Sequence, residues 1–549
     1  MSWTCNVCTF INEKPLGLFC EVCECERQSP VATSPKPTKP SNVSTLTATA
    51  TTQPSNSSMP SRAQLEKERL ARLANAQSKS SRSTTVTKRL HSPPPSTSTS
   101  TSTKKPRLSP NSYPTQPSKA RILLTQIAPF PASKTTTTFT QVVQTPRKAF
   151  LSAFQFDLPW IASHLPPHIP ICLALHNPTP NAKPKIQGNI ALVFPKLATA
   201  TGAYSTMHVK LCVFYYAESV RVVVSSANLV DYDWDRLENV VWCQDFPVKL
   251  GRGNTVGGSN FAEAADEDEN SIGAEFKNDL IQLLKDMGAQ EWVWEGLDAF
   301  DFSSCRARLV VSKPGKFVDE DAFKYGLGRL SSIVNEGFGR TGQFKKVVQE
   351  ASLFYQTSSL GSLSTQWLTD FESSARGTLF SATTKTLPKP IPTINILYPT
   401  EETIENSHLG RNGGGTITWN QKMWEQCEYK HLLRDPTLKR VRSLAHSKII
   451  LCQSKEGNNE KERGCYMYLG SHNMTMSAWG RASVVGKVKK EKQLYITNWE
   501  LGVVLIGPEL MDCDNGGTVM DDGSAEWVIP FDVDGLRSHG VGVRAAHVN

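Results

Sequence analysis

The sequence predicts an α/β fold made of two similar α-β-α sandwich halves that are related by a pseudo-two-fold axis. Apolar runs such as PICLALH, IALVFP, KLCVFYY and VRVVVSSA are typical of strands in a sheet that is covered on both faces. Helical periods in FKNDLIQLLKDMG and WLTDFESSARGTL add helices to these strands. A pattern of the first half also recurs in the second, which indicates an internal duplication.

Shifts in composition predict the domain organisation. We expect a compact cysteine-rich unit at residues 1–26, a disordered basic Ser/Thr/Pro linker at 27–119, and two halves at 120–317 and 318–549. The net charge of +9 is unevenly placed, because residues 27–148 carry 19 Lys or Arg against two Glu. That stretch sums to +17, so subtraction leaves the rest of the chain at −8.

The first unit contains two Cys-x2-Cys knuckles, which are formed by Cys5, Cys8, Cys20 and Cys23. Four thiolates with this spacing suit one tetrahedral Zn²⁺, and a segment so short needs the metal in order to fold. The sequence therefore predicts a small zinc ribbon in which the metal is structural.

This unit resembles the Ran-binding-protein-type zinc ribbon, whose members bind either ubiquitin or single-stranded RNA. Thr9 and Phe10 follow the second cysteine, and Val22 lies between the last two, as in the ubiquitin-binding version. The central spacing of 11 residues is slightly longer than usual. The resemblance implies ubiquitin binding, and a finger that only folds or binds something else is the alternative.

Two basic clusters in the linker, Lys88-Arg89 and Lys104-Lys105-Pro106-Arg107, resemble a bipartite nuclear localisation signal. A basic tail that binds any polyanion is the alternative. The chain has no apolar run long enough to cross a bilayer and no signal sequence at its start, MSWTCNVC. We expect a soluble protein of the nucleus without a membrane partner.

The two halves repeat one succession: His-x-Lys, strand, hairpin, strand, Ser-x-Asn, and Trp six residues after the Asn. Its residues are His208, Lys210, Asn228 and Trp234 in the first half, and His446, Lys448, Asn473 and Trp479 in the second. Residues two apart in a strand point to the same face, so each histidine would project together with its lysine. Two packed halves would bring two imidazoles and two ammonium groups into one cleft.

This set of side chains suits the cleavage of a phosphodiester. One imidazole can attack phosphorus while the other protonates the leaving oxygen, because imidazole titrates near neutral pH. The lysines and the asparagine amides would stabilise the charge on the phosphoryl oxygens. Fixed cations do the work of a metal here, so we expect no cofactor for catalysis.

The paired motifs resemble the phospholipase D superfamily, whose usual signature places an Asp five residues after the Lys. Tyr215 and Gln453 occupy that position here. The missing Asp fits one branch, the tyrosyl-DNA phosphodiesterase family. That resemblance covers roughly residues 120–540 and includes LSAFQFDLPWI, SSANLVDYDW, QTSSLGSLSTQWL, GSHNMTMSAWG and NWELGVVL.

The resemblance implies a role for each matching residue. His208 would be the nucleophile that forms a phosphohistidine with a DNA 3' end and expels a tyrosine. His446 would protonate the leaving phenolate and then activate the water that releases a 3'-phosphate. Glu500 would orient the second-half pair. The phosphoryl group would be held by Lys210, Lys448, Asn228 and Asn473.

Further positions are implied as substrate contacts. Tyr204 matches an aromatic residue that stacks on a base of single-stranded DNA. Asn239 stands where relatives carry Gln. The loop QTSSLGSL resembles one that binds DNA phosphates through Ser358, Ser359, Gly361 and Ser362.

We therefore expect a DNA-repair phosphodiesterase that removes topoisomerase I peptide and other blocking groups from the 3' ends of single- or double-stranded DNA. Its catalytic body would be monomeric. Another phosphodiesterase, nuclease or phospholipase of the same superfamily is one alternative, against which the absent Asp stands. An inactive adaptor that binds ubiquitin and DNA is another, against which the intact His and Lys residues stand.

Overall fold

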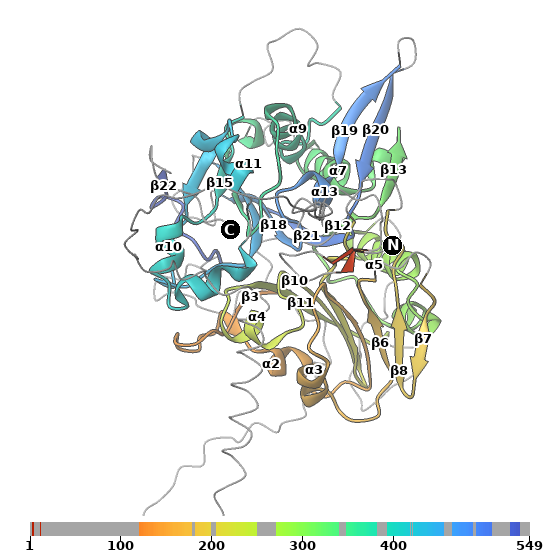
Figure 1. Cartoon of the computed structure of the whole chain (residues 1–549). Coiled ribbons are helices and arrows are strands. Elements are labelled where there is room, and N and C mark those ends of the chain that lie inside the picture. The colour runs from red at the N-terminus through yellow and green to blue at the C-terminus, as the bar shows by residue number, and fades with distance from the viewer. Residues whose placement is uncertain are drawn as a thin grey trace, which may run out of the picture. The chain divides into compact units, whose positions relative to one another are not determined.

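The structure is a computed structural model that describes most of residues 120–538 and two short strands near the N-terminus (Figure 1). The described ranges are 3–4, 11–12, 120–177, 182–198, 205–249, 271–339, 347–380, 392–417, 419, 421–454, 464–486, 490–507 and 528–538. The four cysteines of the predicted zinc site, Thr9, Phe10, Val22, the linker and Tyr204 lie outside these ranges.

The N-terminal strands β1 (Trp3–Thr4) and β2 (Ile11–Asn12) form an antiparallel pair. Trp3 lies opposite Asn12, and Thr4 opposite Ile11. This pair belongs to a unit that is separate from residues 110–549.

Within residues 110–549, the first of two large sheets has the order β4-β3-β11-β10-β9-β5-β6-β8-β7. Its strands are β3 (Arg121–Thr125), β4 (Thr136–Thr137), β5 (Lys148–Ser152), β6 (Ile171–Ala174), β7 (Lys185–Gln187), β8 (Ile190–Val193), β9 (Leu211–Tyr215), β10 (Ser219–Ser225) and β11 (Val240–Pro247). The four apolar runs singled out in the sequence form β6, β8, β9 and β10, which confirms them as strands.

The second large sheet has the order β12-β21-β18-β17-β14-β15-β16-β22. Its strands are β12 (Arg308–Ser312), β14 (Ser352–Gln356), β15 (Asn395–Leu397), β16 (Leu433–Asp435), β17 (Lys448–Gln453), β18 (Gly464–Gly470), β21 (Glu500–Ile506) and β22 (Arg537–Ser538). A smaller sheet with the order β13-β20-β19 consists of β13 (Gly315–Val318), β19 (Arg481–Val485) and β20 (Glu491–Ile496).

The two large sheets repeat one topology. The order β3-β11-β10-β9-β5-β6-β8 corresponds strand by strand to β12-β21-β18-β17-β14-β15-β16. In each, the first four pairings are antiparallel and the last two are parallel. The duplication read from the motifs therefore extends over whole sheets.

This correspondence corrects the expected border between the halves at 317/318. That border would place β12 in the first half, but β12 pairs with β21 and is the edge strand of the second sheet. The change from one sheet to the other therefore lies between Pro247 and Arg308.

The described helices are α2 (Phe139–Val143), α3 (Leu158–His164), α4 (Asp231–Asp235), α5 (Ile272–Asp286), α6 (Glu291–Trp294), α7 (Gly326–Gly339), α9 (Thr365–Ala375), α10 (Glu401–Glu405), α11 (Gln421–Glu425) and α13 (Met476–Trp479). Short 3-10 turns are η1 (Glu295–Ala299), η2 (Asp321–Phe323), η4 (Gly410–Thr416) and η5 (Lys430–Leu432). The two helical periods of the sequence correspond to α5 and α9, each of which begins after a serine N-cap.

Alternate residues of the strands face different layers, as the two-residue period of a strand requires. Val222 and Val224 of β10 share one core with Met467 and Leu469 of β18 and with α5. The outer face of the first sheet packs against α2 and α3, and that of the second against α7 and α9 (Figure 1). Helix α5 also packs in this shared core, so helical side chains lie against both faces of the sheets, and the two sheets share the inner core with it.

In the described part of the chain, no helix has the length and apolar character that crossing a bilayer requires.

Candidate active site

Both motif histidines lie where the two halves meet. The His208 backbone N donates to Trp499 O at 2.9 Å, and the His446 backbone N donates to Glu238 O at 2.9 Å. Each bond joins residues of opposite halves, and each acceptor lies just before the first residues of β21 or β11. The residues just before β11 therefore position His446, and the residue just before β21 positions His208.

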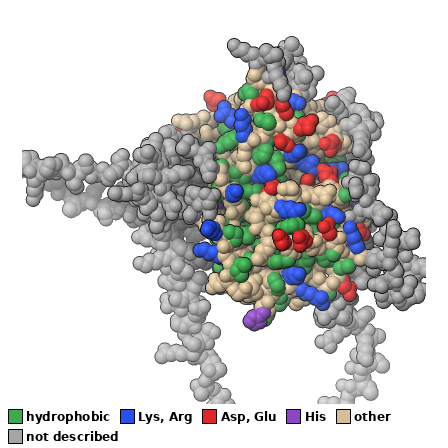
Figure 2. Space-filling model, turned by 90° about the vertical axis from the view of Figure 1, so that its right-hand side faces the viewer, with side chains coloured by type: hydrophobic (Ala, Val, Ile, Leu, Met, Phe, Trp, Pro, Cys, Tyr) green, Lys and Arg blue, Asp and Glu red, His purple; other side chains and the backbone are tan. Residues whose placement is uncertain are grey.

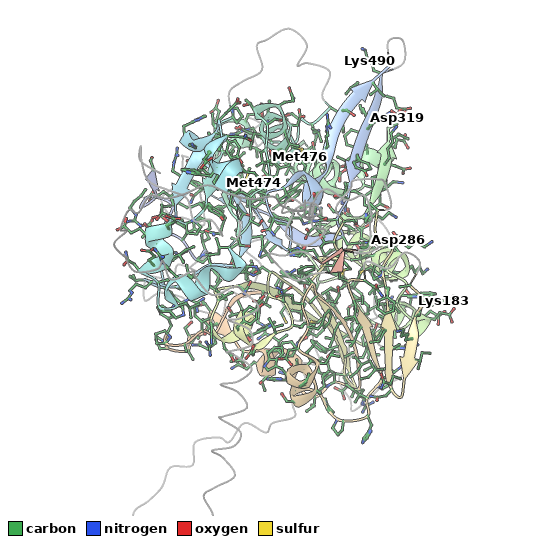
Figure 3. The ribbon with its side chains drawn as sticks, viewed as in Figure 1. Lys183, Asp286, Asp319, Met474, Met476 and Lys490 are labelled. Carbon is green, nitrogen blue, oxygen red and sulfur yellow. The ribbon has the colours of Figure 1, made fainter. Side chains whose placement is uncertain are left out.

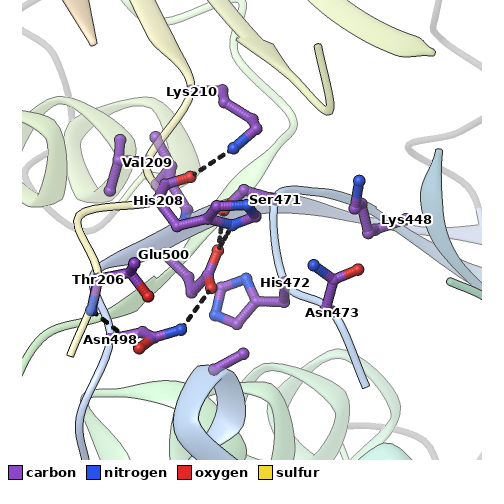
Figure 4. Close-up of polar contacts among 12 residues, drawn as sticks. Thr206, His208, Val209, Lys210, Lys448, Ser471, His472, Asn473, Asn498 and Glu500 are labelled. Atoms are coloured by element: carbon purple, nitrogen blue, oxygen red, sulfur yellow. Dashed lines mark hydrogen bonds and ion pairs between the residues drawn. The ribbon is translucent and has the colours of Figure 1, made fainter. Parts of the chain in front are cut away.

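The His208 ring is held by Glu500 (Figure 4). Its Nδ1 lies 2.6 Å from Glu500 Oε2, which also accepts a hydrogen bond from Ser471 Oγ at 2.6 Å. The other oxygen, Oε1, accepts from Asn498 Nδ2 at 3.2 Å. Glu500 was expected to orient the second-half pair, and the geometry corrects this, because its carboxylate contacts the first-half histidine.

Asn239 has the matching position toward His446. Its Oδ1 lies 3.0 Å from His446 Nδ1 and accepts from Ser226 Oγ at 2.7 Å, while its Nδ2 donates to Asp233 O at 2.8 Å. Asn239 is completely buried. The expectation that it contacts substrate is therefore wrong for this structure, in which it positions the second-half histidine.

The two lysines are buried beside the histidines. Lys210 Nζ donates to His208 O at 3.1 Å, and Lys448 Nζ donates to His446 O at 2.5 Å. Only 2% of Lys210 and none of Lys448 is exposed. Each half brings its histidine and lysine together, but the expected placing of both within a strand is wrong, because β9 begins only at Leu211 and β17 at Lys448.

Asp233, at the third position of α4, is a site residue that the sequence analysis missed. Its Oδ2 accepts from the Asn228 backbone N at 2.6 Å and lies 3.7 Å from His446 Nδ1. Its Oδ1 is buried without a hydrogen-bond partner. No motif spacing points to it, and the only signal was an aspartate shortly after the motif asparagine.

Asn473 is held by the loop QTSSLGSL, residues 356–363. Its Oδ1 accepts from Thr357 Oγ1 and Ser358 Oγ, each at 3.2 Å, which leaves its Nδ2 donors for an anion. Ser358 is buried, so its hydroxyl serves Asn473 here, whereas Ser359 is half-buried and Ser362 is exposed. Gly361 N donates to Met474 O at 3.3 Å and ties this loop to the second motif. Figure 3 labels Met474 beside this region.

Burial and the two lysines set the charge state of the site. Burial lowers the pKa of His208 and, helped by Lys448 and Lys210, lowers the pKa of His446 well below its usual value. The same burial lowers the pKa of Lys210 to about 8. Although burial opposes it, the contact with His208 lowers the pKa of Glu500 to about 2. The free site therefore holds neutral imidazoles beside an ionised carboxylate.

Such a site is prepared for a phosphodiester anion. Nδ1 of His208 faces Glu500, so its Nε2 is the nitrogen whose lone pair is available for attack. A bound anion adds the negative charge that stabilises both ammonium groups, and it raises the pKa of His446 toward the range where imidazole acts as a general acid.

His472, next to Asn473, is a buried structural residue in this arrangement. Its Nε2 lies 2.9 Å from Ser312 Oγ, and its Nδ1 lies 2.5 Å from Tyr468 OH. Gly502 leaves room for Tyr468, because a Cβ at this glycine would lie 2.2 Å from the tyrosine ring. Both ring nitrogens of His472 are therefore occupied.

The chain is similar to known proteins over most of its length. A family model described as tyrosyl-DNA phosphodiesterase matches residues 121–537. The chain is 27% identical over 385 residues to tyrosyl-DNA phosphodiesterase 1 of Arabidopsis thaliana, which covers 65% of this chain and 56% of that protein. It is 26% identical over 369 residues to a probable tyrosyl-DNA phosphodiesterase of Caenorhabditis elegans, which covers 65% and 75%. The matched region thus spans little more than half of the Arabidopsis protein.

The fold is similar to the crystal structure of yeast tyrosyl-DNA phosphodiesterase. The TM-score is 0.53 at 16% sequence identity, and the match covers 78% of this chain and 99% of the yeast chain. At this identity the likeness shows the fold. Since the family model matches well over half of the sequence, the chain belongs to the tyrosyl-DNA phosphodiesterase family.

Proposed function

We propose that this protein hydrolyses the bond between a DNA 3' phosphate and a tyrosine, such as that of a topoisomerase I peptide, and that it removes other 3' blocking groups. The observation that carries the proposal is that the charges of Lys210 and Lys448 both act on His208 and on His446, and that each imidazole is held through Nδ1. The names of the related proteins supply the substrate class.

In the first step, His208 Nε2 attacks phosphorus and the bond from phosphorus to the tyrosine oxygen breaks. The phenolate leaves with a proton from His446, and the phosphoryl group remains on His208. Glu500 stabilises the positive charge that this places on the His208 ring. The two ammonium groups and the Asn473 amide face the charge on the phosphoryl oxygens.

In the second step, His446 takes a proton from water, and the resulting hydroxide attacks the phosphohistidine. The bond from phosphorus to His208 Nε2 breaks, which restores the imidazole and releases a 3'-phosphate. His446 ends each cycle with its proton returned, so the two histidines keep separate roles.

A single strand that carries a 3'-phosphotyrosine tests the reaction. Incubation in EDTA should convert it completely to the 3'-phosphate, whereas the same strand with a 3'-hydroxyl should stay intact. Unchanged phosphotyrosine would overturn the proposed activity, degradation of the 3'-hydroxyl strand would indicate a nuclease instead, and loss of activity in EDTA would contradict a reaction without metal.

For the N-terminal unit we propose a structural Zn²⁺ held by the four thiolates of its knuckles, and ubiquitin as the partner. Thr9, Phe10 and Val22 would form the contact, and the basic clusters of the linker would direct the protein to the nucleus. Full-length protein should bind ubiquitin, and Thr9→Ala/Phe10→Ala should bind it more weakly while the zinc content stays the same. If the variant binds ubiquitin as tightly as wild type does, the proposed contact is wrong. If the protein binds RNA in preference to ubiquitin, RNA is the partner instead.

A further inference from the structure

Strands β19 and β20 of the small sheet lie between Asn473 and Glu500 in the chain, and β13, which follows β12, completes the sheet by pairing with β20 (Figure 1). One face of this sheet packs into the body of the protein through Phe317, Leu494 and Ile496. The period of two along a strand turns the alternate residues to the other face, which nothing in the described part of the chain covers. Figure 3 labels Lys490 and Asp319 near the outer end of this sheet.

A row of three side chains crosses the exposed face. Lys316 of β13 lies directly opposite Tyr495 of β20, and Tyr495 lies directly opposite Arg481 of β19. Side chains that are paired in this way are about 5 Å apart at Cβ. Tyr495 is 38% exposed, and both cations are exposed. Among the described residues, none of the three side chains has a hydrogen-bond or ion-pair partner.

The next row adds polar groups. Gln493 lies between Val318 and Ser483. Farther along β20, the Glu491 carboxylate accepts a hydrogen bond from Gln493 Nε2, so an acidic group marks the outer end of the face. Figure 2 shows that one side of the molecule carries charges of both signs among apolar side chains.

An exposed aromatic ring flanked by two cations on a sheet matches the chemistry of a nucleic-acid single strand. A base stacks on the ring, and the phosphates on either side meet Lys and Arg. We propose that Lys316, Tyr495 and Arg481 bind the single-stranded part of the DNA strand whose 3' end lies in the active site. This inference rests on the proposed function, since it assumes DNA as the substrate.

The position of the row suits one continuous strand. Tyr495 lies five residues before Glu500, which fixes the nucleophilic histidine. Five extended residues span at most about 18 Å, so an oligonucleotide of several nucleotides bridges the two places. Three stacked nucleotides span about 10 Å at roughly 3.4 Å per nucleotide, so we expect a trimer to reach Tyr495 less well than a longer strand.

Binding of plain 3'-hydroxyl oligonucleotides by full-length protein, followed by fluorescence anisotropy, tests the row without relying on cleavage. Wild type should bind a 14-mer more tightly than a trimer. Tyr495→Ala should weaken 14-mer binding by about five- to a hundredfold, as expected for one lost stacking contact. Tyr495→Phe should retain the affinity, and trimer binding should not change in either variant.

A matched pair of charge variants separates the row from general electrostatics. Lys316→Ala/Arg481→Ala and Lys183→Ala/Lys185→Ala each remove two positive charges, the latter at or beside β7. The first variant should lose affinity for the 14-mer and the second should not. Equal losses in both, or a Tyr495→Ala variant that binds the 14-mer like wild type, would overturn the proposal.

Cleavage distinguishes failure of this inference from failure of the proposed function. A phosphotyrosyl trimer should be processed equally by wild type and Tyr495→Ala, whereas a phosphotyrosyl 14-mer should show a raised KM in the variant. If no phosphotyrosyl strand is cleaved but 14-mer binding still depends on Tyr495, the proposed DNA-binding row is supported and the proposed activity is refuted. If cleavage is intact and wild type and Tyr495→Ala have the same KM for the 14-mer, the proposed activity is supported and the proposed DNA-binding row is refuted.

Discussion

His208 Nδ1 lies 2.6 Å from Glu500 Oε2, although 292 residues separate the two in the chain. The corresponding contact in the other direction joins His446 and Asn239 at 3.0 Å. Each half therefore supplies the group that fixes the tautomer and orientation of the other half's histidine. Neither half alone contains a complete site, which gives the duplicated fold a chemical reason to stay together.

The Glu500 contact predicts the effect of Glu500→Gln. The amide keeps the size of the side chain but removes the charge that stabilises a phosphorylated His208 ring, so kcat/KM should fall by at least about 100-fold. Ser471→Ala removes one hydrogen bond to the same carboxylate and should cost much less. Steady-state kinetics on a 3'-phosphotyrosine strand measure both, and equal effects would contradict the role of the charge.

The separate roles of the histidines predict different products. His446→Asn removes the group that activates water, so DNA should stay attached to His208 and a covalent adduct should accumulate in denaturing gels. His208→Ala removes the nucleophile, so no adduct should form. An adduct in the His208→Ala variant would reverse the assignment.

Substitution of Asp233 should shift the pH dependence of kcat/KM. Burial lowers the pKa of Lys210 to about 8 and lowers the pKa of Lys448 well below its usual value, while the Asp233 and Glu500 carboxylates oppose the effect in both. In the proposed reaction both lysines bind phosphate in their charged forms, so activity should fall as pH rises through their pKa values. Asp233→Asn removes negative charge, lowers the lysine pKa values further and should move the alkaline limb of kcat/KM to lower pH.

Asp235→Asn is the control for this measurement, because Asp235 is on the same helix, α4, but is exposed. Its alkaline limb should coincide with that of wild type. An Asp233→Asn variant that loses activity equally at every pH would show a role in packing rather than in the charge of the lysines.

Substitution of Arg440 should lower the stability of the protein. It donates through Nε to the buried Glu238 carboxylate and through a terminal nitrogen to Thr125 O at 2.8 Å, so it ties the second half to the first. Arg440→Ala leaves Glu238 buried without its partner and should cost about 3–5 kcal/mol of unfolding free energy. Denaturant unfolding measures this cost, and Arg411→Ala, which breaks an exposed ion pair with Glu405, should change little.

A double variant separates charge from packing at Arg440. Glu238→Gln/Arg440→Ala removes both charges and should regain part of the stability that Arg440→Ala loses. If the double variant is as unstable as the single one, packing of the Arg440 side chain accounts for the loss.

The periodic spacing of apolar residues in the sequence predicted many of the strands and helices. The strand runs became β6, β8, β9 and β10, and the helical periods became α5 and α9, because short-range alternation of apolar residues reflects which face is buried. The border between the halves was placed too late, since β12 looks like any other strand and only its pairing with β21 assigns it to the second sheet.

The sequence by itself determined the duplication and the close spacing of each histidine with its lysine, on which the proposed phosphodiester chemistry rests. Only the tertiary structure decided that Glu500 holds His208, that Asn239 holds His446, and that Asp233 lies beside both lysines. The physical reason is that the first set depends on spacings of a few residues along the chain. The second depends largely on how two sheets pack across their shared core, which no local spacing records.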